Sequence, residues 1–140
     1  MGTSLTRVVR FHASHHYFRP DWTEERNRTT FGTCAEPPGH GHDYECRVTV
    51  SGPVDPVTGM LMDLALLDRI LEEEILRPLD GLHFNLDVSA FAYGRQIPTG
   101  EAVATYLYQC IAARLPAPVR LTRVRVQEDP TLYAECTGPD

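Results

Sequence analysis

The sequence contains no lysine: its 13 basic residues are all arginine. This absence excludes Schiff-base chemistry on a lysine and the phosphate-binding loop that depends on one. No stretch approaches the roughly 18 consecutive apolar residues of a membrane-spanning helix, so a membrane is not an expected partner. The formal net charge is -6 and the pI is about 5.4. Nucleic acid is therefore not an expected partner either, because its binding depends on Lys and Arg neutralising phosphates.

Cysteine is scarce, with four widely spaced residues: Cys34, Cys46, Cys110 and Cys136. The first residues, MGTSLTRVVRFH, carry charges where a signal peptide would need its apolar region. A disulfide framework is therefore not expected, and we expect a reducing, cytoplasmic location. Cys46, Cys110 and Cys136 fall on apolar faces of expected elements and are assigned to the core.

The length of 140 residues, with 42% apolar and 23% charged residues, predicts one globular domain over residues 1–140. Apolar periodicity predicts an α+β fold, with two helices on one face of a mostly antiparallel sheet. Strands are expected over 5–15, 40–52, 60–62, 123–128 and 132–136. One helix is expected from the cap Asp63 to Pro78, with Leu64, Leu67, Leu71 and Ile75 inward, and a second from Pro98-Thr99 to Pro116. Asp21 with Glu24 is expected to cap a short helix within 16–39, and 80–96 is expected to be a polar connection.

Three histidines form the strongest candidate site. His40 and His42 lie on the same side of a strand, and Gly41 between them permits a close approach to the backbone. His15 ends another strand on its patterned face. If the strands meet, three imidazole nitrogens leave one ligand position open, as in catalytic zinc sites. The alternative from spacing alone is that these rings are simply packed or face solvent.

Two further residues have both a chemical and a plain interpretation. Cys34, in a loop before His40, is a base or nucleophile if a metal or imidazolium lowers its pKa, and otherwise an inert thiol. Glu128 ends the apolar face of its strand. Its carboxylate either accepts two parallel hydrogen bonds from the N–H and NH2 groups of a planar ligand or lies in water at a sheet edge. Glu101 suits the first turn of the second helix, where an acid complements the helix dipole.

Six ordered motifs resemble the 6-pyruvoyl-tetrahydropterin synthase family, which includes the 6-carboxy-tetrahydropterin synthases. They run from Phe11 to about Tyr133 and read FHASHHY, FGTCAEPPGHGHDY, DPVTGMLMDLALL, RPLDGLHFNLDV, PTGE and VQED. The resemblance implies the tunnelling fold, in which trimers join their sheets into a barrel and two trimers stack as a homohexamer with sites between subunits. It also implies Zn2+ on His15, His40 and His42, and 7,8-dihydroneopterin triphosphate as the substrate.

The same resemblance implies roles for individual residues. Cys34 matches the family's proton-shuttling cysteine, Asp80 its relay aspartate and Glu128 its pterin-anchoring carboxylate, while Thr99 and Glu101 match the pair at the pterin pocket. The match departs from the family at the relay histidine, because the usual LDH is replaced by Leu79-Asp80-Gly81. His83 lies two residues further on, and it reaches the same space only if the loop is rearranged.

Three functions follow as alternatives from the resemblance. The first is a zinc-dependent lyase that eliminates triphosphate and yields 6-pyruvoyl-tetrahydropterin; the five residues between Cys34 and His40 resemble this branch. The second is the queuosine-pathway 6-carboxy-tetrahydropterin synthase, which cleaves the side chain of the same substrate. The third is a non-catalytic pterin binder that has lost the relay histidine, which Gly81 would favour.

Overall fold

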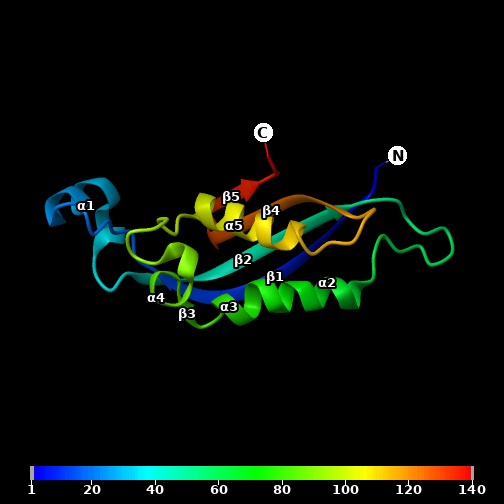
Figure 1. The fold of residues 1–140 in the computed structure, drawn as a ribbon, viewed down its shortest axis with the longest axis horizontal. Helices are drawn as coiled ribbons and strands as arrows, with labels where there is room; N and C mark the ends of the chain where they lie inside the picture. The colour runs from blue at the N-terminus through cyan, green and yellow to red at the C-terminus, as the bar shows by residue number, and fades with distance from the viewer. Residues whose placement is uncertain (1, 140) are drawn as a thin grey trace.

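A five-stranded sheet organises the computed structural model, which describes residues 2–139 (Figure 1). The long strands β1 (Ser4–His15) and β2 (His40–Ser51) pair antiparallel over their whole length. β4 (Arg120–Asp129) pairs antiparallel with β2, and β5 (Leu132–Cys136) with β4. The short β3 (Leu82–His83) runs parallel to β1 at the other edge, giving the order β3-β1-β2-β4-β5.

Two helical segments cover one face of this sheet (Figure 1). One begins at α2 (Leu64–Leu71), passes through a π-helical turn over Glu72–Leu76 and ends in α3 (Arg77–Leu79). The other is α5 (Gly100–Ala112). Their apolar residues, including Leu67, Ile75 and Leu107, are buried against the inward side chains of β1, β2 and β4. This core lies between one sheet face and two helical segments, which confirms the predicted α+β arrangement.

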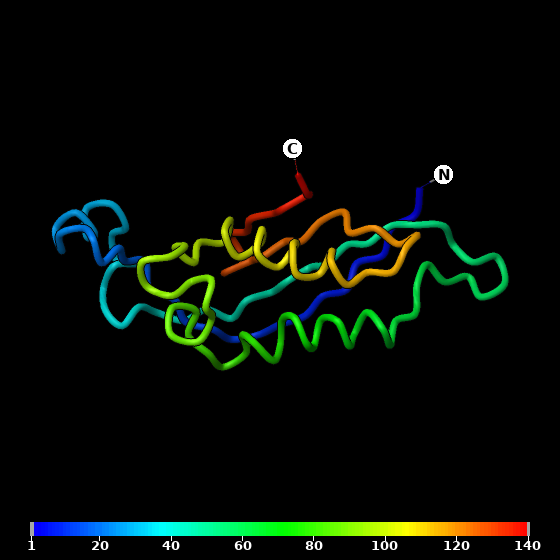
Figure 2. The backbone as a smooth tube through the Cα atoms, viewed as in Figure 1, coloured from blue at the N-terminus to red at the C-terminus, as the bar shows by residue number. Residues whose placement is uncertain are grey.

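The remaining short elements lie toward one end of the molecule. They are α1 (Glu24–Phe31), the 3-10 turn Gly32–Ala35, α4 (Phe84–Asp87) and the 3-10 turn Ser89–Phe91. Figure 2 shows α1 at one end of an elongated molecule and the connection between β2 and α2 at the other. None of the helices in residues 2–139 is both long and apolar enough to cross a membrane.

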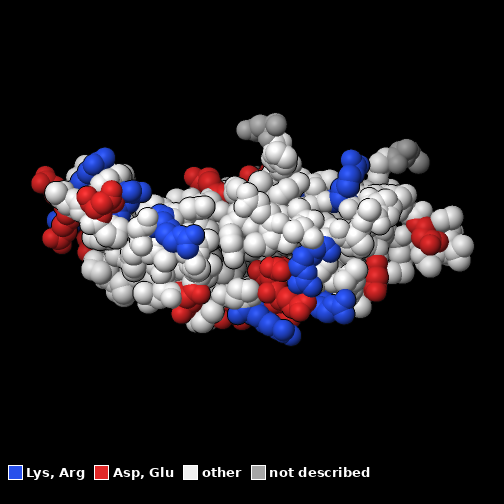
Figure 3. Space-filling model, in the orientation of Figure 1, with Lys and Arg blue, Asp and Glu red and all other residues white. Residues whose placement is uncertain are grey.

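Charges of both signs are mixed on the face seen in Figure 3, where acidic and basic side chains gather together over α2 and again over α1. Arg114 joins Glu73 at 2.9 Å and Glu74 at 3.2 Å, and Arg77 joins Glu72 at 3.7 Å. The three consecutive glutamates Glu72 to Glu74 are therefore each paired with an arginine, and they do not form a purely negative surface patch.

The helix boundaries include several corrections to the sequence expectations. Asp63 caps α2, accepting a bond from Ala65 N–H at 2.9 Å as expected, but Leu64 is 41% exposed and Ile70 takes the buried position. The segment continues past Pro78, because this proline falls in the first turn of α3, where a missing N–H costs little. Thr23 and not Asp21 caps α1, since its hydroxyl accepts from Arg26 N–H at 3.1 Å.

Two further expectations for the connections were wrong. Residues 60–62 form no strand: 61 and 62 lie in a bend, so the chain enters α2 without a further strand. The polar connection 80–96 contains β3, α4 and a 3-10 turn, whose short lengths carry no readable periodicity. Among the cysteines, Cys46 is fully buried as expected, whereas Cys110 and Cys136 are only half-buried.

Candidate metal centre

The register of β1 and β2 brings the three histidines together. His15 lies opposite His40, and Ala13 lies opposite His42, so all three imidazoles fall at one end of the strand pair. The Nε2 atom of His15 lies 3.1 Å from that of His40 and 3.2 Å from that of His42. Their ring nitrogens form a cluster that can hold a metal ion, so the two strands do bring the three rings together.

The geometry of this cluster fits a tetrahedral metal. Zinc–nitrogen distances of about 2.0–2.1 Å place two tetrahedral ligands about 3.3–3.4 Å apart, close to the observed separations. Three imidazoles and no carboxylate or thiolate in the cluster leave a fourth position for an oxygen ligand. His15 is fully buried, and burial, followed by the charges of His42 and His40, lowers its pKa to about 3. The buried ring is therefore neutral, which is the form that binds metal.

Tyr44 supports the buried histidine from behind. Its hydroxyl lies 3.0 Å from the Nδ1 atom of His15, and the contact is buried. Because the Nε2 atom of His15 faces the other two rings, Nδ1 is free to carry the hydrogen and donate it to this hydroxyl. Sequence reasoning did not identify this role of Tyr44. Its position two residues after His42 on the same strand could have indicated it, because residues two apart share one face of a strand.

Side chains on the outward face of β1 lie close to the backbone of Gly41. A Cβ atom at this position would stand 2.9 Å from the Nε2 atom of His12 and 3.2 Å from the Ser14 hydroxyl. The His12 ring also lies 2.9 Å from Asp43, so these side chains gather behind the metal cluster, on the side away from the helices. The close approach expected at Gly41 is therefore made by the protein itself.

Glu128 lies beside the cluster from the adjoining strand β4. Its Oε2 atom is 3.8 Å from the Nε2 atom of His42, and its Oε1 atom is 3.4 Å from the Tyr17 hydroxyl, which donates to it. Its side chain is only 10% exposed, so it does not lie in open water at a sheet edge. Burial raises the pKa of Glu128, while His42 and the Tyr17 hydroxyl oppose that rise.

Thr99 and Glu101 begin α5 close to Glu128. The Thr99 hydroxyl caps the helix by accepting from Ala102 N–H at 3.1 Å, and Glu101 lies exposed in the first turn. A Cβ atom at Gly100 would stand 3.6 Å from the Oε1 atom of Glu128, so the start of the helix lies against that carboxylate. The partial positive charge at this end favours the ionised form of Glu128.

Cys34 lies in the 3-10 turn after α1, and its carbonyl accepts from Tyr17 N–H at 2.9 Å. Partial burial, followed by the negative charge of Glu128, raises the pKa of its thiol. A lowered pKa, expected if a metal or imidazolium lies near the thiol, is not produced by burial and Glu128, which both act in the opposite direction.

Asp80 and His83 bind backbone groups of the described chain. Asp80 Oδ1 accepts from His12 N–H at 2.9 Å, and His83 Nε2 donates to the Pro38 carbonyl at 2.9 Å. Gly81 has φ of +77°, a left-handed conformation that bends the chain into β3. His83 consequently lies opposite Ser14 in the sheet, one residue from His15. In addition to burial, the charge of His83 contributes to the lowered pKa of His15, whereas no hydrogen bond joins Asp80 to Cys34 within residues 2–139.

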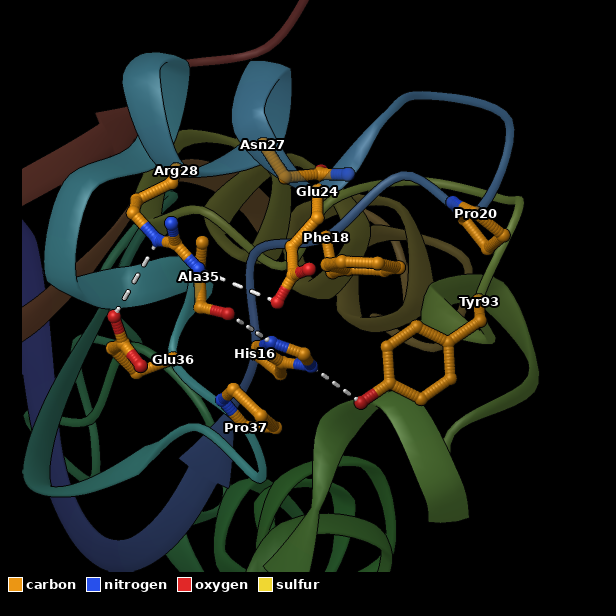
Figure 4. A pocket seen from close by; sticks show the side chains of 10 residues that line it. All are labelled: His16, Phe18, Pro20, Glu24, Asn27, Arg28, Ala35, Glu36, Pro37 and Tyr93. Atoms are coloured by element: carbon orange, nitrogen blue, oxygen red, sulfur yellow. Dashed lines mark hydrogen bonds and ion pairs between the residues drawn. The ribbon is translucent and has the colours of Figure 1, made fainter.

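His16 lines a separate cavity of about 680 Å³, whose lining includes none of the three clustered histidines (Figure 4). Its Nε2 donates to the Ala35 carbonyl at 2.8 Å, so its Nδ1 accepts from the Tyr93 hydroxyl at 2.7 Å. The ring also stacks on Phe18 at 5.3 Å. Because both nitrogens are occupied, His16 ties loops together and does not join the neighbouring metal cluster.

Comparison with known proteins agrees with this geometry. The family model described as "6-pyruvoyl tetrahydropterin synthase" matches residues 4–139. The human 6-pyruvoyl tetrahydrobiopterin synthase is 41% identical over 124 residues, covering 89% of this chain and 83% of the human protein. The structure of the Caenorhabditis elegans 6-pyruvoyl tetrahydropterin synthase superposes with a TM-score of 0.91 at 30% identity, covering 99% of this chain and 97% of that one. An uncharacterised Wolinella succinogenes protein, with a TM-score of 0.72 and 17% identity over 99% of each chain, shares the fold.

Proposed function

The chain belongs to the 6-pyruvoyl tetrahydropterin synthase family, and on that premise we propose that it is a zinc-dependent lyase acting on 7,8-dihydroneopterin triphosphate. The proposed reaction eliminates triphosphate and yields 6-pyruvoyl-tetrahydropterin. The observation that carries the proposal is the convergence of three imidazole Nε2 atoms beside the largely buried carboxylate of Glu128. One group suits a metal, and the other suits the N–H and amino edge of a pterin ring.

His15, His40 and His42 are the proposed ligands of Zn2+. When bound, the ion would polarise the hydroxyls of the substrate side chain and acidify the neighbouring C–H. The protein's contribution is to hold the three rings in a fixed arrangement on paired strands, with His15 oriented by Tyr44.

Glu128 is the proposed anchor of the pterin ring. An ionised carboxylate can accept two parallel hydrogen bonds from the ring N–H and the amino group, which sets both the position and the orientation of the ring. Thr99 and Glu101 are proposed to border the same pocket, because Gly100 between them lies against Glu128. In this proposal the ring lies beside His42, since Glu128 Oε2 is 3.8 Å from the Nε2 atom of that proposed ligand.

Cys34 is the proposed proton-transfer residue, with Asp80 and His83 as its relay. Its thiol must lose its proton to act as a base, and burial and Glu128 oppose that loss. A neighbouring imidazole or metal charge is therefore needed to favour the thiolate. The assignment of His83 to the relay is supported by its charge, which contributes, in addition to burial, to the lowered pKa of His15. Asp80 is bonded to the His12 backbone, so its part in the relay requires another arrangement or another subunit.

We also propose that the active form is a homohexamer of two stacked trimers, with the sheets joined into barrels and sites between subunits. Support comes from the sheet face opposite the helices, which carries exposed side chains such as Arg10 and Arg47, and from the edge strand β5. Leu132 and Tyr133 on β5 are more than half exposed at that edge. Unpaired strand edges with apolar side chains favour association. A cytoplasmic location and a single 140-residue domain complete the proposal.

Product analysis tests the proposed reaction against its alternatives. The zinc-loaded protein would be incubated with 7,8-dihydroneopterin triphosphate, and the pterin mass and released triphosphate would be measured. A pyruvoyl product supports the proposal, whereas side-chain cleavage to a carboxy product would identify the queuosine-pathway reaction. Tight binding without triphosphate release between pH 6 and 9 would identify the non-catalytic binder.

A further inference from the structure

Tyr17 lies between the histidine cluster and Glu128. Its ring centroid is 4.6 Å from that of His15, with the planes tilted by 47°. Its hydroxyl is 3.4 Å from the Oε1 atom of Glu128, and its backbone N–H donates to the Cys34 carbonyl at 2.9 Å. A single residue therefore contacts one proposed metal ligand, the proposed ring anchor and the turn that carries the proposed base.

The Tyr17 ring is held from its outer side by further aromatic residues. Phe31, at the end of α1, meets it edge-on with ring centroids 5.9 Å apart. Trp22 stacks on Phe31 at 5.7 Å with the planes only 12° apart. Because the ring is packed between His15 and Phe31, the direction of its hydroxyl toward Glu128 is set by packing.

The two oxygens of Glu128 have different surroundings. Oε1 faces the Tyr17 hydroxyl and the backbone of Gly100, whereas Oε2 faces His42 at 3.8 Å. The 3.4 Å contact is longer than the usual 2.5–3.0 Å of an O–H···O bond, so Tyr17 steadies the carboxylate without clamping it. A carboxylate has about four acceptor positions, and Tyr17 uses one, which leaves enough for two bonds to a ring.

We propose that Tyr17 is a positioning residue that orients the carboxylate of Glu128 toward the pterin ring. The proposal rests on the proposed function of Glu128 as the ring anchor. Two parallel hydrogen bonds require the carboxylate plane to match the ring plane, so a group that restricts rotation of this side chain lowers the entropy lost on binding. Tyr17 acts through Glu128 and needs no contact with the substrate.

The test is a double-mutant cycle on neopterin binding, with Tyr17→Phe, Glu128→Gln and the pair together, all zinc-loaded. Glu128→Gln replaces one acceptor with a donor facing the donors of the ring, and we expect about a hundredfold weaker binding. Tyr17→Phe keeps the ring packing and removes only the hydroxyl, and we expect roughly three- to tenfold weaker binding. In the Glu128→Gln background, Tyr17→Phe should add less than about twofold.

Two further measurements separate positioning from a structural role. KM for the triphosphate substrate should rise with the loss of neopterin affinity in Tyr17→Phe, while kcat and zinc content stay within about twofold of wild type. Tyr93→Phe is the matched control, because it also removes a tyrosine hydroxyl that donates in the same region, but to His16 and not to Glu128. It should leave neopterin affinity unchanged.

Different results overturn different parts of the account. If Glu128→Gln leaves neopterin affinity unchanged, the anchor role is wrong, and the Tyr17 proposal fails with it. If Glu128→Gln weakens binding but Tyr17→Phe does not, only the Tyr17 proposal fails. If the losses of neopterin affinity multiply fully in the double variant, Tyr17 acts independently of Glu128, and the proposal fails. Zinc loss in Tyr17→Phe would also contradict it, because Tyr17 would then act on the histidine cluster.

Discussion

The candidate site divides into groups carried by long strands and groups carried by loops, and the two sets are arranged differently. His15, His40, His42 and Glu128 stand on β1, β2 and β4, and their side chains converge within one chain. Cys34, Asp80 and His83 lie in or beside short turns and engage mainly backbone groups, as with Asp80 and the His12 N–H. The comparison indicates that strand pairing alone brings together the groups proposed to bind the metal and the ring, whereas the groups proposed to transfer protons need a further element of structure.

The reason for the difference is register. A β-ladder places each residue opposite a fixed partner, and a shift by one residue would turn every side chain to the other face. His15 and His40 are direct partners in a ladder of 12 residue pairs, so their positions are set by many bonds at once. A loop residue is held by only a few local bonds, and its position responds to a ligand or a neighbouring subunit.

The largest expected effect separates the two sets by function. Cys34→Ala should leave zinc content and neopterin affinity unchanged, because the strand-borne groups remain. It should lower turnover by about a hundred- to ten-thousandfold, the usual contribution of a positioned proton-transfer group. The measurement is kcat beside zinc content on the same preparation. Turnover near that of wild type would show that another residue acts as the base.

The next effect concerns the stability of the strand-borne cluster without metal. The pKa of His15 is about 3 in the folded chain and near 6.5 when unfolded, so the unfolded chain binds more protons between these values. The stability contribution is complete above pH 6.5 and is lost as the pH falls toward 3. Denaturant unfolding of the chelator-treated protein should show a free energy lower by about 2 kcal/mol at pH 5 than at pH 8. His15→Phe, which cannot be protonated, should flatten this dependence; an equally steep slope would assign it to other groups.

A smaller effect tests the proposed role of His83 in the relay. His83→Ala should lower turnover by about tenfold if His83 serves the relay, with zinc retained, because His83 is not among the proposed metal ligands. The control is Leu82→Ala, the exposed neighbour on the same short strand. Equal turnover in His83→Ala and wild type would remove His83 from the mechanism and strengthen the non-catalytic alternative.

The smallest effect tests the turn itself. Gly81→Ala should destabilise the protein by about 1 kcal/mol, because a Cβ atom is unfavourable at φ of +77° although no atom lies within 4 Å of it. The measurement is the midpoint of denaturant unfolding. Gly2→Ala is the control, because a Cβ atom at Gly2 also has no atom within 4 Å but the φ of Gly2 is not left-handed. An unchanged midpoint would mean that the backbone at residue 81 can leave the left-handed conformation without loss of stability.

Sequence reasoning succeeded where periodicity carried the information. Alternation along 5–15 and 40–52 predicted both long strands and the shared face of the three histidines, and the structure confirms those elements and brings the rings together. The cap Asp63 and the start of the second helix at Pro98-Thr99 were likewise predicted, and the structure shows Asp63 and Thr99 each accepting from a free N–H group in the first turn. The roles of these residues in catalysis stay predictions.

It failed where the decisive contacts join segments distant in the sequence. Nothing local to Leu82 and His83 indicates that two residues pair with β1, since the pairing depends on the left-handed turn at Gly81. The raised pKa of the Cys34 thiol arises from partial burial and then from Glu128, a residue 94 positions later, and neither cause could be read from the loop. Tyr17 was missed for the same reason, because its partner is also Glu128.

Zinc content of two histidine variants on the same strand pair tests the central claim most directly. His42 points into the cluster, whereas His12 points to the opposite face of the sheet, where it meets Asp43. After loading with zinc and extensive dialysis, wild type and His12→Ala should each retain one zinc per chain, and His42→Ala should retain almost none at neutral pH. One tightly held equivalent in His42→Ala, or its loss in His12→Ala alone, would contradict the assignment of the metal to His15, His40 and His42.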